Sequence, residues 1–216
     1  MGSCLLCNQE IPQKLTFSAL FLLKTPENLL CEKCQSTFEK IPEQHCPRCY
    51  KSDVSGLCTD CKNWEKLGIF VNHRAIFRYN AAMKAYFARY KFLGDYRLGQ
   101  VFAPYFAKLA GNAVLVPLPL SPESLKERGF NQVSAFLEQT KFQELLTKST
   151  SPRQSSLDRH ARLASKNTFS IKPEVHLPPK ILLIDDIYTT GRTLQHAVET
   201  LKTASVTEIS TFSLCR

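Results

Sequence analysis

The chain has 216 residues and a mass of 24.5 kDa, with 44% hydrophobic and 22% charged residues. This composition is that of a globular protein and excludes a wholly disordered, collagenous or fibrous chain. Lys and Arg number 28 against 19 Asp and Glu, so the formal net charge of +9 favours an anionic partner. The length suits one large domain, or a small domain followed by a medium one.

Apolar stretches are too short to predict a membrane-spanning helix anywhere in the sequence. The apolar stretch 17–23 is interrupted by Ser18 and follows two cysteines, so a cleaved signal peptide is not expected either. The sequence therefore predicts a soluble, cytoplasmic protein that does not insert into a membrane.

Cysteine dominates the amino-terminal part of the chain. Eight of the nine cysteines form four Cys-x-x-Cys pairs, which are Cys4/Cys7, Cys31/Cys34, Cys46/Cys49 and Cys58/Cys61. Two cysteines separated by two residues can bind one ion in a tight turn, and two such turns complete a tetrahedral thiolate site. Disulfides would need an oxidising compartment, and a redox motif would explain one pair but not four. The spacing therefore predicts two zinc ions.

The four pairs can be shared between two ions in more than one way. The simplest assignment is sequential, with Cys4, Cys7, Cys31 and Cys34 around one ion and Cys46, Cys49, Cys58 and Cys61 around the other. The second set is compact, with eight residues between its pairs, and is typical of a zinc ribbon. An interleaved, cross-braced arrangement is the alternative that the spacing leaves open.

Charge divides the chain near Trp64. Residues 1–64 carry seven basic and seven acidic side chains, whereas residues 65–216 carry 21 basic and 12 acidic ones. Zinc-bound thiolates would make the first segment net negative, so the positive charge that could attract nucleic acid lies in the second. We therefore expect a zinc-binding module at 1–64, stabilised by its metal and suited to docking a partner, followed by a larger domain at 65–216.

Helical and strand patterns alternate in the second segment. Strands are predicted at 73–79, 113–118, 180–184 and 208–213, and helices at 80–93, 95–110, 121–127, 131–140 and 193–204. Gly94 and Gly111 end the first two helices, and Ser-Pro-Glu from Ser121 is typical of a helix start. The polar stretch 150–162 predicts a mobile loop. Strands that alternate with helices indicate an α/β fold with a parallel sheet.

The most informative stretch is 181–193, where an apolar strand leads through Asp185 and Asp186 into a turn of small residues that opens a helix. Backbone N–H groups and hydroxyls of residues 189–193 would bind a phosphate at the helix N-terminus. The two carboxylates would face the hydroxyls of an attached ribose, or its Mg²⁺. An acidic turn that caps an ordinary helix would account for any one of these residues but not for the whole string. The Walker signature is absent from the sequence, which excludes a P-loop ATPase.

The string 182–193 resembles the phosphoribosyl diphosphate (PRPP) loop of type I phosphoribosyltransferases. Further segments with family-like residues lie at 90–94 (YKFLG), 115–119 (LVPLP), 126–132 (KERGFNQ) and 154–169. In the last of these, the matching residues are Gln154, Leu157, Arg162, Asn167 and Phe169. With the cysteine pairs, they make the chain similar to the ComF family over essentially its full length. The resemblance implies a type I phosphoribosyltransferase-like fold, a role in the uptake of single-stranded DNA during natural transformation, and a helicase-like partner, ComFA.

The resemblance also assigns residue roles. Asp185 and Asp186 match the acidic pair that holds the ribose hydroxyls, and are the expected catalytic residues. The expected 5′-phosphate loop consists of Thr189, Thr190, Gly191, Arg192 and Thr193. Diphosphate is expected at the turn after Val116. Arg128 is the nearest strong cation after this turn and would contact the diphosphate or the substrate; alternatively, it is an ordinary surface arginine on a helix. Arg162 and Asn167 either reach the ligand or cap local structure.

Residues 65–111 carry eight basic and two acidic side chains, interleaved with aromatic ones. Basic tracks with aromatic stacking surfaces suit single-stranded DNA, and the candidate contacts are Lys84, Arg89, Lys91 and Arg97. On the predicted helix 80–93, Lys84 and Lys91 share one face, whereas Met83, Phe87 and Tyr90 share another that we expect in the core.

Three functions remain open from the sequence. The first is a zinc-bearing competence protein that binds PRPP and single-stranded DNA and docks ComFA. The second is an active phosphoribosyltransferase of nucleotide salvage, which would displace diphosphate from PRPP with the help of Mg²⁺. The third is a scaffold that senses nucleotides without turnover. No base-binding segment is recognisable, and none of the five histidines lies within these motifs, so no acceptor is identified.

Overall fold

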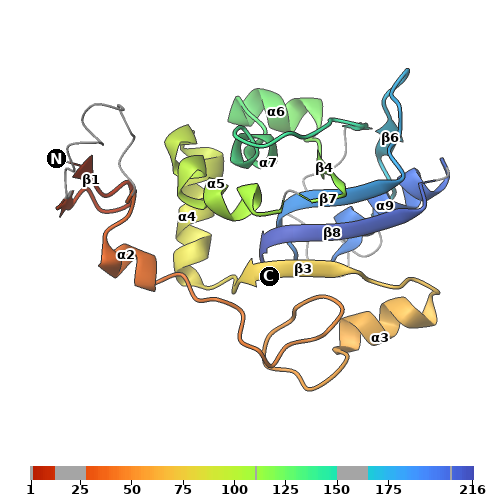
Figure 1. Cartoon of the computed structure of the whole chain (residues 1–216), viewed down its shortest axis with the longest axis horizontal. Coiled ribbons are helices and arrows are strands. Elements are labelled where there is room, and N and C mark those ends of the chain that lie inside the picture. The colour runs from red at the N-terminus through yellow and green to blue at the C-terminus, as the bar shows by residue number, and fades with distance from the viewer. Residues whose placement is uncertain (1, 13–27, 110, 150–164, 205) are drawn as a thin grey trace.

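The computed structural model describes residues 2–12, 28–109, 111–149, 165–204 and 206–216. At its centre lies a four-stranded sheet in the order β3–β8–β7–β4. These strands are His73–Phe77 (β3), Val114–Pro117 (β4), Lys180–Ile187 (β7) and Glu208–Cys215 (β8). All three pairings are parallel and helices flank the sheet, which confirms the predicted α/β class (Figure 1).

Strand β7 is paired on both edges, and its residues 181–184 are all apolar because this part of the strand is covered on both faces. Leu182 and Ile184 enter a hydrophobic cluster with side chains of helices α4, α5 and α7, which are Ala81–Phe92, Gly99–Ala107 and Gln132–Phe136. Ile181 and Leu183 enter a second cluster with side chains of α3 (Thr59–Lys66) and α9 (Arg192–Lys202). This alternation of side chains along a strand sets two helical layers around the sheet.

The predicted end of this strand at residue 184 is too early. Asp185 pairs with Ser213 and Ile187 with Cys215 of β8, so the ladder continues through the acidic pair. Polar side chains do not end a strand whose backbone still has a partner, because the hydrogen bonds belong to the main chain. Asp185 and Asp186 therefore lie on β7 itself, near its carboxyl end.

The predicted helix starts agree with the side-chain caps. Asn80 accepts a hydrogen bond from the N–H of Met83 at the start of α4, and Ser121 accepts one from Ser124 at the start of α6 (Pro122–Arg128). Two predicted helices are shorter than expected. Instead of one helix from residue 95, a 3₁₀ turn, Tyr96–Leu98 (η1), precedes α5, which ends at Ala107, and residues 131–140 contain only α7.

An antiparallel pair of short strands, Leu146–Lys148 (β5) and Phe169–Ile171 (β6), was not predicted. Three residues carry too little periodicity to be recognised, and the two strands are far apart in the sequence. The loop expected at 150–162, with Arg162, lies outside the described residues.

The amino-terminal segment contributes β1 (Gly2–Ser3), β2 (Glu10–Ile11) and α2 (Glu32–Ser36), which lie beside α4 (Figure 1). Arg89 of α4 donates to the carbonyl oxygens of Leu6 and Leu5 at 2.8 and 3.0 Å, and pairs with Asp95 at 2.9 Å. Both hydrophobic clusters include side chains from either side of residue 64. No helix within the described ranges is long and apolar enough to cross a bilayer.

Replacing Arg89 by Met removes these hydrogen bonds and leaves two backbone carbonyls without their donor. We expect the free energy of unfolding to fall by about 2–3 kcal/mol, measured by urea denaturation. Arg97→Met is the matched control, because Arg97 is 73% exposed and lies 3.5 Å from the same Asp95; its effect should stay within about 0.5 kcal/mol. Equal stabilities of the two variants would contradict the anchoring role of Arg89.

Candidate functional site

A cavity of about 400 Å³ opens at the carboxyl end of β7. It is lined by α4, the turn after β4, α6, the start of α7, β5, the end of β7 and the turn that leads into α9. Its charged and hydroxyl side chains are Lys84, Lys91, Arg128, Lys148, Asp185, Asp186, Ser121, Ser124, Thr189, Thr190 and Thr193, with Tyr79 at one side. Ligands of open α/β sheets bind at this end of the strands. The cavity thus brings together the acidic pair, most of the predicted phosphate loop (residues 189–193) and Arg128.

The two carboxylates differ in their surroundings. Asp185 accepts a hydrogen bond from the N–H of Asp186 at 2.9 Å, whereas the carboxylate of Asp186 forms an ion pair with Lys91 of α4. Burial, together with the neighbouring charge of Asp186, raises the pKa of Asp185 to about 7. Lys91 and Lys148 oppose this shift only in part. A carboxyl group in this state gains from a bound cation or from the hydroxyl groups of a ligand.

The turn into α9 requires a glycine at position 191. Gly191 caps the helix with a φ of 80°, a left-handed conformation that glycine adopts without strain. A Cβ atom there would lie 2.1 Å from the hydroxyl oxygen of Tyr188, so space excludes a side chain as well. Small residues and the N-terminus of an eleven-residue helix are the features that bind anions in such turns.

Basic side chains surround the acidic pair. Arg128 donates from Nη1 to Oε1 of Gln132 at 3.0 Å, while its Nε and the Nε2 of Gln132 are buried without a protein partner in the described structure. Lys148 stands on β5, where burial lowers its pKa although Asp185 acts in the opposite direction. With Lys84 and Lys91, four cations face two carboxylates across the cavity, an excess that suits a polyanionic ligand.

Two residues of the predicted phosphate loop do not line the cavity. Gly191 shapes the turn, and Arg192 lies against the ring of Trp64 and 3.6 Å from Glu199. Asn167 also lies elsewhere: it donates to the carbonyl oxygen of His196 at 2.9 Å and accepts from the N–H of Phe169. These contacts connect β6 to α9. They match the second of the two roles predicted for Asn167, that of capping local structure. Lys148 was missed because no motif surrounds it on its short strand.

The four cations predicted to contact DNA are not together. Lys84 and Lys91 line the cavity, Arg89 binds the first cysteine turn, and Arg97 lies exposed beside Asp95. As predicted, Met83, Phe87 and Tyr90 are buried in the core. Other aromatic side chains of this region, Tyr79 and Phe92, line the cavity and are 42% and 57% exposed.

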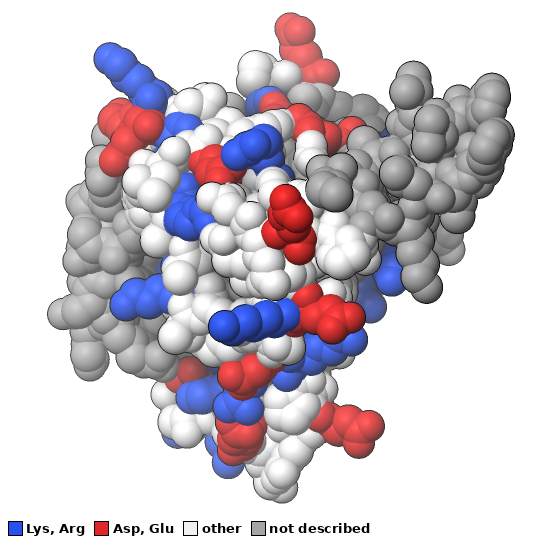
Figure 2. Space-filling view, turned by 90° about the vertical axis from the view of Figure 1, so that its left-hand side faces the viewer, with Lys and Arg blue, Asp and Glu red and all other residues white. Residues whose placement is uncertain are grey.

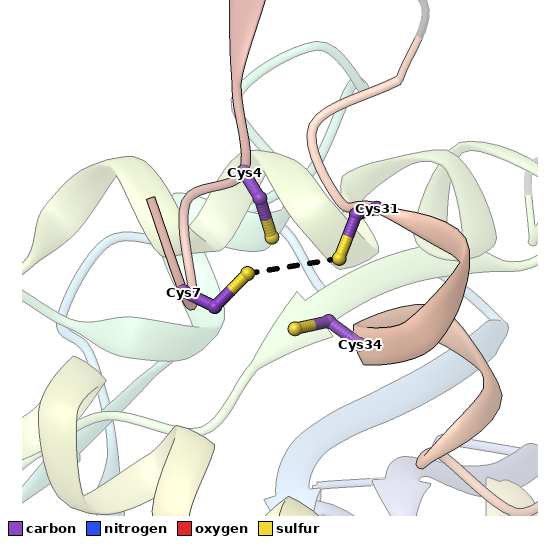
Figure 3. Close-up of side chains that lie close together, drawn as sticks. All are labelled: Cys4, Cys7, Cys31 and Cys34. Carbon is purple, nitrogen blue, oxygen red and sulfur yellow. Dashed lines mark hydrogen bonds between the residues drawn. The ribbon is translucent and has the colours of Figure 1, made fainter. Parts of the chain in front are cut away.

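The eight amino-terminal cysteines form two clusters in the sequential arrangement. The first cluster is Cys4, Cys7, Cys31 and Cys34, and the second cluster is Cys46, Cys49, Cys58 and Cys61, with all ligand atoms of a cluster within 4.8 Å of one another. Figure 3 shows the four sulfurs of the first cluster pointing toward a common centre. Closest sulfurs lie 3.6 Å apart between Cys7 and Cys31, and 3.5 Å between Cys49 and Cys58.

These sulfur distances fit metal coordination. All nine cysteines are free thiols, and four thiolates about 2.3 Å from one ion place their sulfurs about 3.8 Å apart. Disulfide sulfurs would lie at about 2.0 Å. Each cluster can therefore hold a metal ion in a closed four-sulfur site.

The two clusters repeat one local structure. Cys31 and Cys58 occupy the N-cap positions of α2 and α3; the sulfur of Cys58 accepts a hydrogen bond from the N–H of Cys61, whereas the side chain of Cys31 makes no capping hydrogen bond. Asn8 and Tyr50, which follow the first cysteine pair of each cluster, have φ values of 60° and 61°. In the second cluster, a hydrogen bond from Cys61 lowers the pKa of Cys49 to about 5, with Arg216 adding to the effect against burial. The same hydrogen bond, together with burial, raises the pKa of Cys61, so in this pair Cys49 is the thiolate and Cys61 keeps its proton.

Figure 2 views the molecule from the side of β1 and α2. Lys and Arg lie interspersed with Asp and Glu over the described part of this face.

Three known competence proteins resemble the chain over at least 90% of its length. The chain is 46% identical over 218 residues to competence protein ComFC of Streptococcus pneumoniae, with 99% of each chain covered. It is 35% identical over 228 residues to competence protein ComFC of Bacillus subtilis, covering 99% of this chain and 94% of that one. Competence protein F of Haemophilus influenzae is 23% identical, with 90% and 93% covered. No family model matches the chain.

The fold and the site define an α/β protein with a polar cavity at the ends of its parallel strands and two four-cysteine sites able to hold metal ions. At 46% and 35% identity over nearly its whole length, the chain belongs to the ComFC family of competence proteins. The predicted ComF resemblance is thereby confirmed, and with it a role in competence.

The raised pKa of Asp185 predicts a pH-dependent stability. The unfolded chain ionises this group above its ordinary pKa of 3.8, whereas the folded chain retains the proton up to about 7, so stability falls as the pH rises between these values. At pH 8 we expect the free energy of unfolding of Asp185→Asn to exceed that of the wild type by about 1–2 kcal/mol. At pH 4 we expect this difference to disappear. Chemical denaturation at both pH values measures it.

Glu208→Gln provides the control, because Glu208 is an exposed partner of Lys180 at the other end of the sheet. An Asp185→Asn variant with the same stability difference at both pH values would rule out a buried, proton-retaining carboxyl group.

Proposed function

We propose that this competence protein handles single-stranded DNA during natural transformation and that its cavity binds PRPP together with Mg²⁺. The observation that carries the proposal is the meeting, in one cavity, of the acidic pair on β7, the phosphate loop and four cations. A sugar that bears phosphates at two positions presents hydroxyls to the carboxylates and anionic groups on both sides of them. That distribution of charge matches the lining.

Each part of the ligand has a complementary part of the cavity. The 5′-phosphate would accept hydrogen bonds from the hydroxyls of Thr189, Thr190 and Thr193 and from backbone N–H groups of the phosphate loop. Asp185 and Asp186 would hold the ribose hydroxyls. The diphosphate would lie by the turn after β4, where the unpaired Nε of Arg128 and Nε2 of Gln132 supply donors. Mg²⁺ bound with PRPP would neutralise part of the diphosphate charge.

The alternative is an active phosphoribosyltransferase of nucleotide salvage. The cations near Arg128 would stabilise a departing diphosphate, and the pKa of Asp185 near 7 suits a group that shares a proton at neutral pH. Diphosphate release from PRPP, measured by mass spectrometry against a panel of acceptors, distinguishes this enzyme from a PRPP-binding scaffold without turnover.

We also propose that single-stranded DNA crosses the mouth of the cavity. Lys84 is exposed on the same face of α4 as Lys91, and Tyr79 and Phe92 are exposed aromatic side chains beside them. Phosphate contacts from lysine with bases stacked on aromatic rings are the usual basis of binding to single strands. Arg97 would extend this track along the surface, whereas the hydrogen bonds of Arg89 give that residue a structural part.

The two clusters would each hold a zinc ion, because closed sites of four thiolates are the common structural zinc sites of proteins. We propose that residues 1–64 act as a zinc module that docks the helicase-like partner ComFA, while residues 65–216 carry the PRPP site. Support comes from the mixed surface charge of the amino-terminal face, which suits a protein partner better than nucleic acid.

Isothermal calorimetry with Mg²⁺ and PRPP tests the ligand. We expect saturable binding by the wild-type protein and at least tenfold weaker binding by Asp186→Asn, because the variant loses a charged acceptor for the ribose hydroxyls. Glu208→Gln should bind as wild type does. Absence of heat with the wild-type protein would overturn PRPP as the ligand; a variant that loses PRPP binding but still supports transformation would make the cavity dispensable for competence.

Fluorescence anisotropy with labelled oligonucleotides tests the DNA contacts. Lys84→Ala should weaken binding severalfold and reduce the slope of log affinity against log salt by about one, because one phosphate contact is lost. Lys202→Ala, which removes an exposed lysine at the far end of α9, serves as the control. Equal losses in both variants, or affinity that does not depend on salt, would contradict a contact at the cavity mouth.

A further inference from the structure

The phosphate loop contacts the second cluster through α3. Trp64 lies three residues after Cys61 on this helix, and its indole is 5% exposed. Its Nε1–H donates to the carbonyl oxygen of Thr190 at 3.3 Å. The guanidinium of Arg192 lies 5.8 Å from the centre of the same ring. The helix that begins at the second cluster thus touches the loop that would bind the phosphate.

Arg216 makes a second connection between the same two parts. Its side chain is 6% exposed, and Nη1 donates to the carbonyl oxygen of Thr189 at 2.9 Å. Nη2 lies 3.6 Å from Asp60, the residue before Cys61, and the guanidinium lies 4.4 Å from the centre of the Tyr188 ring. Arg216 therefore bridges the loop and the start of α3, the helix that carries Cys61 of the second cluster.

These contacts determine where the loop directs its amides. In a trans peptide the carbonyl and the following N–H point in opposite directions. The carbonyls of Thr189 and Thr190 are held toward Arg216 and Trp64, so the N–H groups of residues 190 and 191 are turned to the other side. Thr189 and Thr190 line the cavity, whereas Trp64 and Arg216 do not. The two anchors therefore orient phosphate-binding donors without touching the ligand.

We propose that Trp64 and Arg216 are positioning residues that make ligand binding in the cavity depend on an intact second cluster. The inference rests on the proposed PRPP site and goes beyond it, because it assigns to one of the two four-cysteine clusters a part in ligand affinity. Loss of the cluster would release α3, and with it Trp64 and Asp60, from the positions in which they contact the loop and Arg216. The loop carbonyls would then lose their fixed orientation.

The first cluster provides an internal comparison. The turn between Cys4 and Cys7 contacts α4 instead, where Arg89 donates to the carbonyl oxygens of Leu5 and Leu6. Within the described ranges, the loop carbonyls of Thr189 and Thr190 are bound from the side of the second cluster. The dependence should therefore belong to the second cluster and not to the first.

The test compares variants of the full chain by zinc content, PRPP affinity and tryptophan emission. Arg216→Lys keeps the charge but cannot reproduce the guanidinium contacts, so we expect its PRPP affinity to fall at least tenfold. It should still bind two zinc ions per chain, and its melting temperature should stay within a few degrees of the wild-type value. Arg48→Lys is the matched control, since Arg48 neighbours Cys49 but pairs with Glu65. Unchanged PRPP affinity in Arg216→Lys would overturn the proposal, as would equal losses in the two variants.

Cysteine variants test the two clusters separately. Cys58→Ser and Cys7→Ser should each lose one zinc ion, but only Cys58→Ser should weaken PRPP binding tenfold or more. Trp64 is the single tryptophan of the chain, so its emission should shift with PRPP at the same midpoint as the calorimetric titration. Heat without any change in emission, or equal effects of the two serine variants, would contradict coupling through the second cluster.

Hydrogen exchange separates failure of this inference from failure of the PRPP site. Without ligand, Arg216→Lys should raise the exchange rate of the amides at 190 and 191 at least tenfold relative to wild type and to Arg48→Lys. If the wild-type protein binds no PRPP, the proposed ligand is wrong. The exchange experiment, which needs no ligand, still tests whether Arg216 anchors the loop. Unchanged exchange in Arg216→Lys would overturn the anchoring itself.

Discussion

Two adjacent carboxylates on a strand that is paired on both edges form the constraint on which this structure depends. Like charges so close together cannot both ionise at low cost in a partly buried place, and the raised pKa of Asp185 expresses that cost. Cations from distant parts of the chain, Lys91 of α4 and Lys148 of β5, partly offset this cost. The positions of these two elements around β7 and the charge of the cavity are therefore parts of one arrangement.

The cysteine-rich segment meets this arrangement at two places. On one face of the sheet, Arg89 fixes the first cysteine turn to α4, the helix that supplies Lys84 and Lys91. On the other, Trp64 and Arg216 connect the second cluster to the turn after β7. Metal-dependent folding of a short segment would thus reach both walls of the cavity, through different residues and with different consequences.

Much of this fold is predictable from the sequence because its signals are local. The run 181–184 is apolar without interruption, as a strand buried on both faces must be, and the cysteine spacing predicts two four-cysteine sites, although it leaves open which pairs share a site. The acidic pair and the turn at Gly191 follow from a string of consecutive residues. Caps such as Asn80 and Ser121 are equally local, since each acts within three residues.

What could not be predicted depends on tertiary contacts. Arg89 and Lys91 are two residues apart on one helix, yet one binds backbone carbonyls of the first cysteine turn and the other binds Asp186. Lys148 joins the cavity through a three-residue strand that pairs with a segment more than twenty residues later. The links from Trp64 and Arg216 to the phosphate loop span more than one hundred residues in one case and leave no pattern in the sequence.

A crystal structure of the protein with Mg²⁺ and PRPP tests the central claim most directly. We expect electron density for the 5′-phosphate against residues 189–193, with the ribose hydroxyls at Asp185 and Asp186 and the diphosphate toward Arg128. A cavity that remains empty at saturating PRPP, or a ligand that binds with its phosphates away from the turn before α9, would contradict it.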